Sequence, residues 1–110
     1  MTLSTHVLDT TLGLPAAGVV VSLTQDDRTL FEGETDADGR CPAIRLLSLA
    51  PGTYRLVFAM ADYFSGQGML LSEPPFLDRV AIDFGIADVA AHYHVPLLVS
   101  PYGYSTYRGS

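Results

Sequence analysis

Lysine and tryptophan are absent from this chain of 110 residues. All six of its positive side chains are arginine, against twelve acidic residues, and the net charge is −6. The arginines are scattered along the chain and form no basic stripe that could follow a phosphate backbone. The acidic residues are concentrated between Asp26 and Asp38. We therefore expect no nucleic-acid partner.

Cysteine and long apolar runs are also scarce. The single cysteine, Cys41, excludes an intrachain disulfide and is typical of a buried apolar filler. No segment approaches the roughly 18 consecutive apolar residues of a membrane span. The first residues lack the basic region and apolar run of a secretory signal. We expect a soluble, cytoplasmic protein that binds no membrane.

The length predicts a single domain over residues 1–110, because this is near the commonest domain size. Hydrophobic residues make up 48% of the chain and charged residues only 16%. Some apolar surface should therefore face another copy of the chain. An oligomer is expected.

Short runs of β-branched and aromatic residues alternate with turns rich in glycine, proline and aspartate. This pattern is typical of an all-β sandwich of two four-stranded antiparallel sheets. The predicted strands cover residues 3–10, 17–24, 28–35, 41–46, 53–59, 79–85, 91–99 and 103–107. One short helix is expected over residues 61–67, where glycines then end it.

Period-two alternation indicates which side chains of the strand 91–99 share a face. Tyr93, Val95, Leu97 and Val99 form an apolar face that predicts the core. The opposite face carries His92, His94, Pro96 and Leu98, a poor surface for solvent, so a neighbouring subunit should cover it. If the first and last strands are neighbours, His6, Ser105 and Tyr107 join His94 there. Tyr102, Tyr104 and Thr106 are assigned to the core.

Five stretches of the chain resemble the 5-hydroxyisourate hydrolases, which are transthyretin-related proteins of purine catabolism. These stretches are Ser4–Asp9, Asp38–Cys41, Tyr54–Phe58, His92–Leu98 and the closing Tyr107–Ser110. The resemblance covers essentially the whole chain. Its last element, Tyr-Arg-Gly-Ser, distinguishes these hydrolases from transthyretin, the thyroid-hormone carrier. It implies a transthyretin-like sandwich and a homotetramer, a dimer of dimers, with active sites in the channel between the dimers.

The resemblance also implies a reaction and a site. The reaction is hydrolysis of 5-hydroxyisourate, a small-molecule substrate, to 2-oxo-4-hydroxy-4-carboxy-5-ureidoimidazoline, without a cofactor. The implied catalytic residues are His6, Arg40, His94 and Ser110. The implied substrate-binding residues are His6, Arg40, His94, Tyr107, Arg108, Gly109 and Ser110.

Residue chemistry suggests a role for each catalytic group. Water must attack an amide-like carbonyl, so a base, an oxyanion partner and a proton donor are needed. His6 is the expected base, with the Ser110 carboxylate orienting it or the water. Arg40 suits the oxyanion through its fixed charge and fork of donors. His94 would bind substrate or relay a proton.

Other interpretations stay open at this stage. Each histidine could be a structural residue, Arg40 could be merely solvated, and Arg108 competes with it for the cation role. Ser110 has no base at a fixed spacing, so covalent catalysis is disfavoured. Three imidazoles from His6, His92 and His94 could hold zinc, although no carboxylate supports them and no metal is expected.

Two further classes of protein compete with an enzyme. A transthyretin-like carrier would hold a small aromatic ligand in an apolar channel. Burying His6 and His94 in such a channel would cost free energy, because the imidazoles lose their hydration. An adhesion module would have no need of the terminal tetrapeptide.

Overall fold

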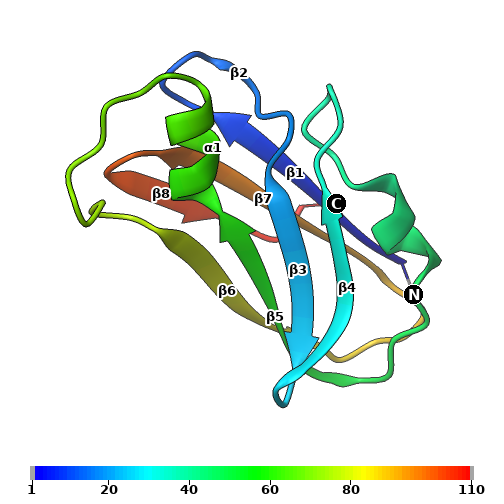
Figure 1. Cartoon of the computed structure of the whole chain (residues 1–110). Coiled ribbons are helices and arrows are strands. Elements are labelled where there is room, and N and C mark those ends of the chain that lie inside the picture. The colour runs from blue at the N-terminus through cyan, green and yellow to red at the C-terminus, as the bar shows by residue number, and fades with distance from the viewer. Residues whose placement is uncertain (1, 110) are drawn as a thin grey trace.

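The structure is a computed structural model and describes residues 2–109. Strands dominate this range, with a 3₁₀ helix and an α-helix between them (Figure 1). The strands are β1 (Thr2–Asp9), β2 (Leu14–Pro15), β3 (Val20–Gln25), β4 (Arg28–Glu34), β5 (Gly52–Ala59), β6 (Arg79–Ile86), β7 (His92–Ser100) and β8 (Gly103–Thr106). The helices are η1 (Pro42–Leu46) and α1 (Met60–Gly66). None of the helices in residues 2–109 has the length and apolar character needed to cross a membrane.

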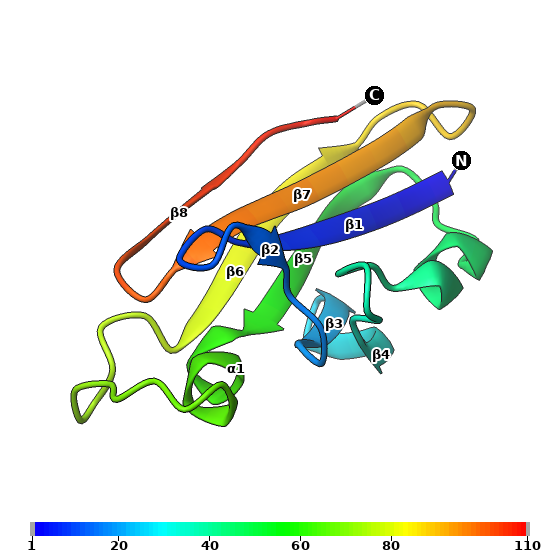
Figure 2. The ribbon, with the colours of Figure 1, turned by 90° about the horizontal axis from the view of Figure 1, so that it is seen from above.

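The strands form two four-stranded sheets that pack face to face (Figure 2). One sheet has the order β2-β1-β7-β8 and the other β4-β3-β5-β6. The expected sandwich is confirmed, except that β1 and β7 run parallel, with Ser4 opposite His94. The first sheet is therefore mixed, and the prediction of wholly antiparallel sheets was wrong. Alternation shows which side chains share a face but is the same for both strand directions.

The core lies between the two sheets and is built from alternate residues of each strand. In β7 the predicted inward residues, Tyr93, Val95, Leu97 and Val99, are all buried. Leu3 and Val7 of β1 face the same side, because they stand opposite Tyr93 and Leu97 in the parallel register. The outer face of this sheet then carries the alternate residues of β1 and β7, including both histidines predicted for the site.

The segment 41–46 is not a strand, contrary to the prediction. Pro42 opens the 3₁₀ helix η1, because it has no N–H to donate to a sheet and its φ already suits a helical turn. Ile44 then packs into the core, and Cys41 before it is buried. The first sheet takes its fourth strand instead from the two residues of β2, which pair with the end of β1.

The helix α1 lies at the end of β5, as the sequence predicted within one residue (Figure 1). Its Met60, Tyr63 and Phe64 are buried against the sandwich. The Tyr63 hydroxyl donates to Oδ2 of buried Asp9 at 2.8 Å, and the other oxygen of Asp9 accepts N–H groups of the turn after β1. Burial and this carboxylate raise the pKa of Tyr63 to about 12. Asp9 therefore links α1 and the turn after β1 to the end of β1.

The last strand is less buried than predicted. Tyr104 stands opposite Val99, on the inward side of the sheet, yet it is 47% exposed, and Tyr102 and Thr106 are exposed as well. Their assignment to the core was wrong. β8 is an edge strand with a strand neighbour on one side only, and a hollow separates its end from β6. Thr106 is held differently, since its hydroxyl donates to the Pro96 carbonyl at 2.7 Å.

Candidate active site

The outer face of the β2-β1-β7-β8 sheet brings together the two histidines that the sequence predicted for a site. His6 is opposite Pro96 in the register of β1 and β7, and His94 lies two residues before that proline. Both side chains are half-buried and point to the same side of the sheet. Ser105 of β8, opposite Leu98, shares this side. Two imidazoles thus share one sheet face although 88 positions separate them in sequence.

Arg40 reaches His6 through a tight turn after β4. In this turn the Asp36 carboxylate accepts the N–H groups of Asp38 and Arg40 at 2.9 and 3.0 Å. The N–H of Val7 then donates to the Gly39 carbonyl at 2.8 Å, and Arg40 pairs with His6 in an antiparallel bridge. The Arg40 side chain remains exposed.

Glycine is required at position 39 for two reasons. Its φ of +75° lies in the left-handed region that other residues rarely adopt. A Cβ there would also come within 2.5 Å of the Val7 carbonyl oxygen. The small residue therefore permits the contact that places Arg40 beside β1.

The segment after β8 runs back to the start of β7 and reaches His94. The N–H of Gly109 donates to the carbonyl of His94 at 2.8 Å and forms an isolated antiparallel bridge. A Cβ on Gly109 would stand 2.5 Å from Cδ2 of the His94 ring. The backbone of Gly109 thus lies directly against the imidazole, and three distant segments converge on this face.

The electrostatic environment keeps His94 neutral to lower pH than usual. Burial disfavours its cation and lowers its pKa, and the nearby charges of Arg40, His6 and His92 lower it further. The charges of Arg40 and His6 therefore act directly on His94. The fixed positive charge of Arg40 beside these imidazoles favours a negatively charged species on this face.

Arg108 and Tyr107 lie further from the histidine face than Gly109. The Arg108 guanidinium is 4.2 Å from the centre of the buried Tyr93 ring and donates to the His92 carbonyl at 3.2 Å. Tyr107 is exposed and borders a hollow of about 370 Å³ between β6 and β8, with Phe84 and Val95. Arg108 thus fastens the terminal segment to β7. Ser110 lies outside the described residues.

Two polar residues of this face were not assigned a role from the sequence. The Ser4 hydroxyl lies 2.7 Å from Nδ1 of His94 and 3.2 Å from Nε2 of His92. The His92 and His94 rings stack at 6.4 Å between centroids. Alternation places Ser4 on the face of His6, but only the strand register shows that it meets His94. Within residues 2–109 no three His, Cys, Asp or Glu side chains are grouped closely enough to hold a metal.

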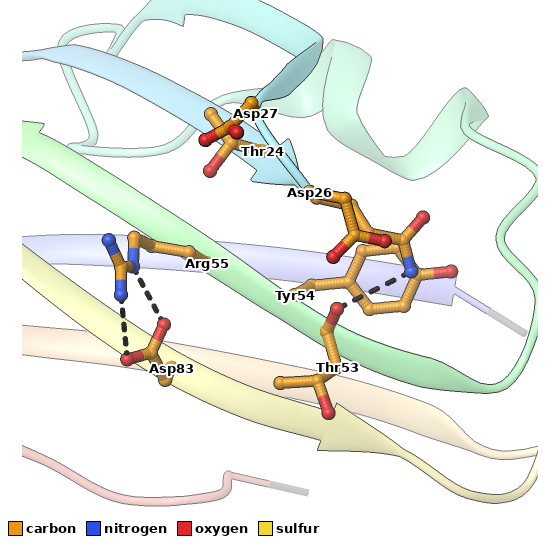
Figure 3. A pocket seen from close by; sticks show the side chains of 8 residues that line it. Thr24, Asp26, Asp27, Thr53, Tyr54, Arg55 and Asp83 are labelled. Atoms are coloured by element: carbon orange, nitrogen blue, oxygen red, sulfur yellow. Dashed lines mark hydrogen bonds and ion pairs between the residues drawn. The ribbon is translucent and has the colours of Figure 1, made fainter.

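A hollow of about 420 Å³ opens on the other sheet, away from these histidines (Figure 3). Asp26 and Asp27 of the β3–β4 turn border it, and Arg55 there forms an ion pair with Asp83. Both charged partners are more than half exposed. Of residues 2–109, the only positive side chain that borders the hollow is therefore already paired, and the hollow contains no histidine, so it is not the candidate site.

The fold and this face define a class of protein, a transthyretin-like sandwich with two histidines and an arginine on the outer side of one sheet. The chain belongs to the HIUase/Transthyretin family, which it matches over residues 3–109.

Relatives and solved structures agree with this assignment. A 5-hydroxyisourate hydrolase of Mesorhizobium japonicum is 58% identical over 114 residues, covering 98% of this chain and 91% of that protein. The structure of Klebsiella pneumoniae 5-hydroxyisourate hydrolase matches with a TM-score of 0.87 and 40% identity, over 99% of this chain and 93% of that one. Sea bream transthyretin in complex with thyroxine gives the same TM-score at 26% identity, over 99% and 95% of the two chains. The fold is therefore shared by a hydrolase and a hormone-binding protein, and sequence identity favours the hydrolase.

Proposed function

We propose that this chain is an enzyme that hydrolyses 5-hydroxyisourate in urate degradation, a branch of purine catabolism. The product is 2-oxo-4-hydroxy-4-carboxy-5-ureidoimidazoline. The observation that carries this proposal is the convergence of His6, Arg40 and His94 on one sheet face of a chain 58% identical to a named hydrolase. A base, a fixed cation and a second imidazole are the groups that hydrolysis of a ring amide requires.

The reaction begins with a water molecule that attacks the amide-like carbonyl of the six-membered ring. His6 takes a proton from this water, and Arg40 stabilises the oxyanion that develops on the carbonyl oxygen. The ring C–N bond then breaks. The proton that His6 took from the water then passes to the departing nitrogen, while neutral His94 donates a hydrogen bond to the substrate from Nε2–H. Water adds and a C–N bond opens, so no cofactor enters the balance.

The terminal segment completes the substrate site in this proposal. Tyr107, Arg108, Gly109 and Ser110 join His6, Arg40 and His94 as substrate-binding residues. The contact of Gly109 with His94 supports this, because it holds the terminal segment against the imidazole. The Ser110 carboxylate orients His6 or the water. Residues appended after Ser110 should therefore reduce activity more than the same residues placed before Met1, and equal activities would remove the carboxylate from the mechanism.

We also propose that residues 1–110 form one domain that assembles into a homotetramer, a dimer of dimers. Apolar side chains on and beside the site face support this: Leu8 and Leu98 are half-buried there, and Leu12 of the adjoining turn and Leu14 of β2 are each 57% exposed. A neighbouring subunit would cover them and enclose the histidines. Sedimentation analysis should give four chains per particle, and a monomer at assay concentration would contradict the assembly. A cytoplasmic location belongs to the same proposal and is checked by cell fractionation.

The test of the function follows the ultraviolet absorbance of 5-hydroxyisourate made in place from urate by uricase. With this protein present, the intermediate should decay faster than it does spontaneously. Tight binding of the substrate without faster decay would instead favour a transthyretin-like carrier. Unchanged decay without binding would exclude both.

A further inference from the structure

A row of side-chain hydrogen bonds links β1 and β7 and ends at Nδ1 of His94. Thr2 is opposite His92 and Ser4 is opposite His94 in the parallel register, and all four side chains share the outer face. The Thr2 hydroxyl is hydrogen-bonded to Nδ1 of His92. The Ser4 hydroxyl then lies between Nε2 of His92, at 3.2 Å, and Nδ1 of His94, at 2.7 Å. The two rings are nearly parallel, with 12° between their planes.

The hydrogen atoms available restrict how this row can be arranged. A serine hydroxyl has one proton, so Ser4 donates to one ring and accepts from the other. A neutral imidazole likewise donates from one nitrogen and accepts at the other. The shorter contact, to His94, suits an O–H donor, and the longer one suits an N–H donor from His92. Thr2 then donates to His92, His92 to Ser4, and Ser4 to His94.

This direction determines which nitrogen of His94 carries its proton. Because Nδ1 accepts from Ser4, the single proton of the neutral ring is on Nε2. Within residues 2–109 the His94 ring forms no other side-chain hydrogen bond, so Nε2 remains for a ligand. The neutral ring is also the favoured form here, since burial and the charges of Arg40, His6 and His92 lower its pKa. Gly109 packs against the ring without adding a charge.

We infer that Ser4 and His92 are positioning residues, which hold the His94 ring and keep its proton on Nε2, facing the substrate. This inference rests on the proposed hydrolase function for its kinetic consequence. Neither residue touches the reacting atoms. Ser4 acts on His94 directly, whereas His92 acts by orienting the hydroxyl of Ser4. Without them the neutral ring can place its proton on either nitrogen, and only one tautomer presents an N–H to the substrate.

The test compares Ser4→Ala with Ser4→Thr, which retains the hydroxyl, and with His92→Phe, which retains the stacked ring. Ser4→Ala should lower kcat about ten- to a hundredfold, as for the disorientation of a hydrogen-bond donor, with KM changed less than about threefold. Ser4→Thr should recover most of kcat. The kcat of His92→Phe should lie between that of Ser4→Ala and that of the unaltered protein. The matched control is Thr10→Ala, which removes a hydroxyl donating to Val99 at the other end of the same strand pair. It should leave kcat unchanged.

A second readout needs no activity. In the nitrogen NMR spectrum of the histidine rings at neutral pH, His94 of the unaltered protein should show its proton on Nε2, and Ser4→Ala should give a mixture of tautomers. The inference is wrong if Ser4→Ala leaves this spectrum unchanged, or if its kcat stays within twofold of the unaltered protein. If the unaltered protein fails to accelerate decay of 5-hydroxyisourate, the proposed function fails, while the spectrum still decides the positioning of His94.

Discussion

The outer faces of the two sheets differ in whether their arginine is paired with a carboxylate. On the β4-β3-β5-β6 sheet, Arg55 and Asp83 form an exposed ion pair with contacts of 2.7 and 3.2 Å (Figure 3). On the β2-β1-β7-β8 sheet, Arg40 lies beside two histidines, and within residues 2–109 it forms no ion pair with a carboxylate. The difference shows that a hollow lined by polar groups is not sufficient for a site. A catalytic site needs charged groups that are available to interact with a ligand.

The largest expected effect comes from removing the two groups that act on the water and the oxyanion. His6→Ala and Arg40→Ala should each reduce turnover by about two to four orders of magnitude, because a base or an oxyanion partner is lost. Arg55→Ala, the matched arginine of the opposite face, should stay near the unaltered rate. Steady-state kinetics with the uricase-coupled assay measures all three. Losses below tenfold in both site variants would mean that the site is misplaced.

A smaller loss is expected when a methyl group is added at Gly109. The new Cβ would come within 2.5 Å of the His94 ring and 3.2 Å of its Cβ, so the ring cannot simply turn away. Gly109→Ala should therefore lower kcat about tenfold or more, as expected for a displaced acid or base. Gly85→Ala on β6, where a Cβ meets nothing within 4 Å, is the control. Equal activity of the two variants would show that the terminal segment does not rest on His94 in solution.

The pKa of His94 should depend on Arg40 and not on Arg55, and this difference can be measured without kinetics. In an NMR titration, His94 should titrate below the ordinary histidine value of about 6.5. Arg40→Ala should raise this pKa but not restore it fully, because burial is the larger cause of the depression. Arg55→Ala should not move it. An unaltered His94 that titrates at or above 6.5 would contradict the described environment.

The same depressed pKa predicts how stability depends on pH. Unfolded His94 takes up its proton near pH 6.5, whereas folded His94 takes it up at lower pH, so the unfolded state binds more protons in between. The contribution of His94 to the free energy of unfolding is therefore present above pH 6.5 and decreases as the pH falls toward the folded pKa. Denaturant unfolding across this range, with and without His94→Ala, isolates it.

The smallest effect is expected at the exposed ion pair. The hydrogen bonds between Arg55 and Asp83, together with their opposite charges, stabilise both ionised forms, which raises the pKa of Arg55 and lowers that of Asp83. Water screens such a pair, so Asp83→Asn should leave the thermal midpoint and the turnover close to those of the unaltered protein. A large loss of either would mean that this face has a role that its exposure does not suggest.

Local patterns carried much of the fold prediction. Alternating burial identified the inward residues of β7, and turn residues marked most strand boundaries, because both follow from short-range geometry. Two of the predictions that were wrong depend on neighbours distant in sequence: the direction of β1 against β7 and the burial of Tyr102, Tyr104 and Thr106. The third, a strand over residues 41–46, overlooked a local signal, because Pro42 opens a 3₁₀ helix there.

The candidate site was predicted unevenly for the same reason. His6, Arg40 and His94 were chosen from motif resemblance, since nothing within a single segment shows that residues 6, 40 and 94 meet. The roles of Ser4 and His92 need the parallel register, in which Ser4 faces His94. Ser110 stays a prediction, because it lies outside the described residues.

The sequence by itself determined which chemical groups are available to a site. They are two histidines on one side of a strand, an arginine after a turn that contains glycine, and a terminal tetrapeptide. Alternation and turn chemistry act over a few residues, so they can be read along the chain. Only the tertiary structure decided which of these groups act together, because the β1–β7 pairing, the Gly39–Val7 contact and the Gly109–His94 contact each close a loop of many residues. Long-range pairing joins the groups into a site, and no local pattern specifies it.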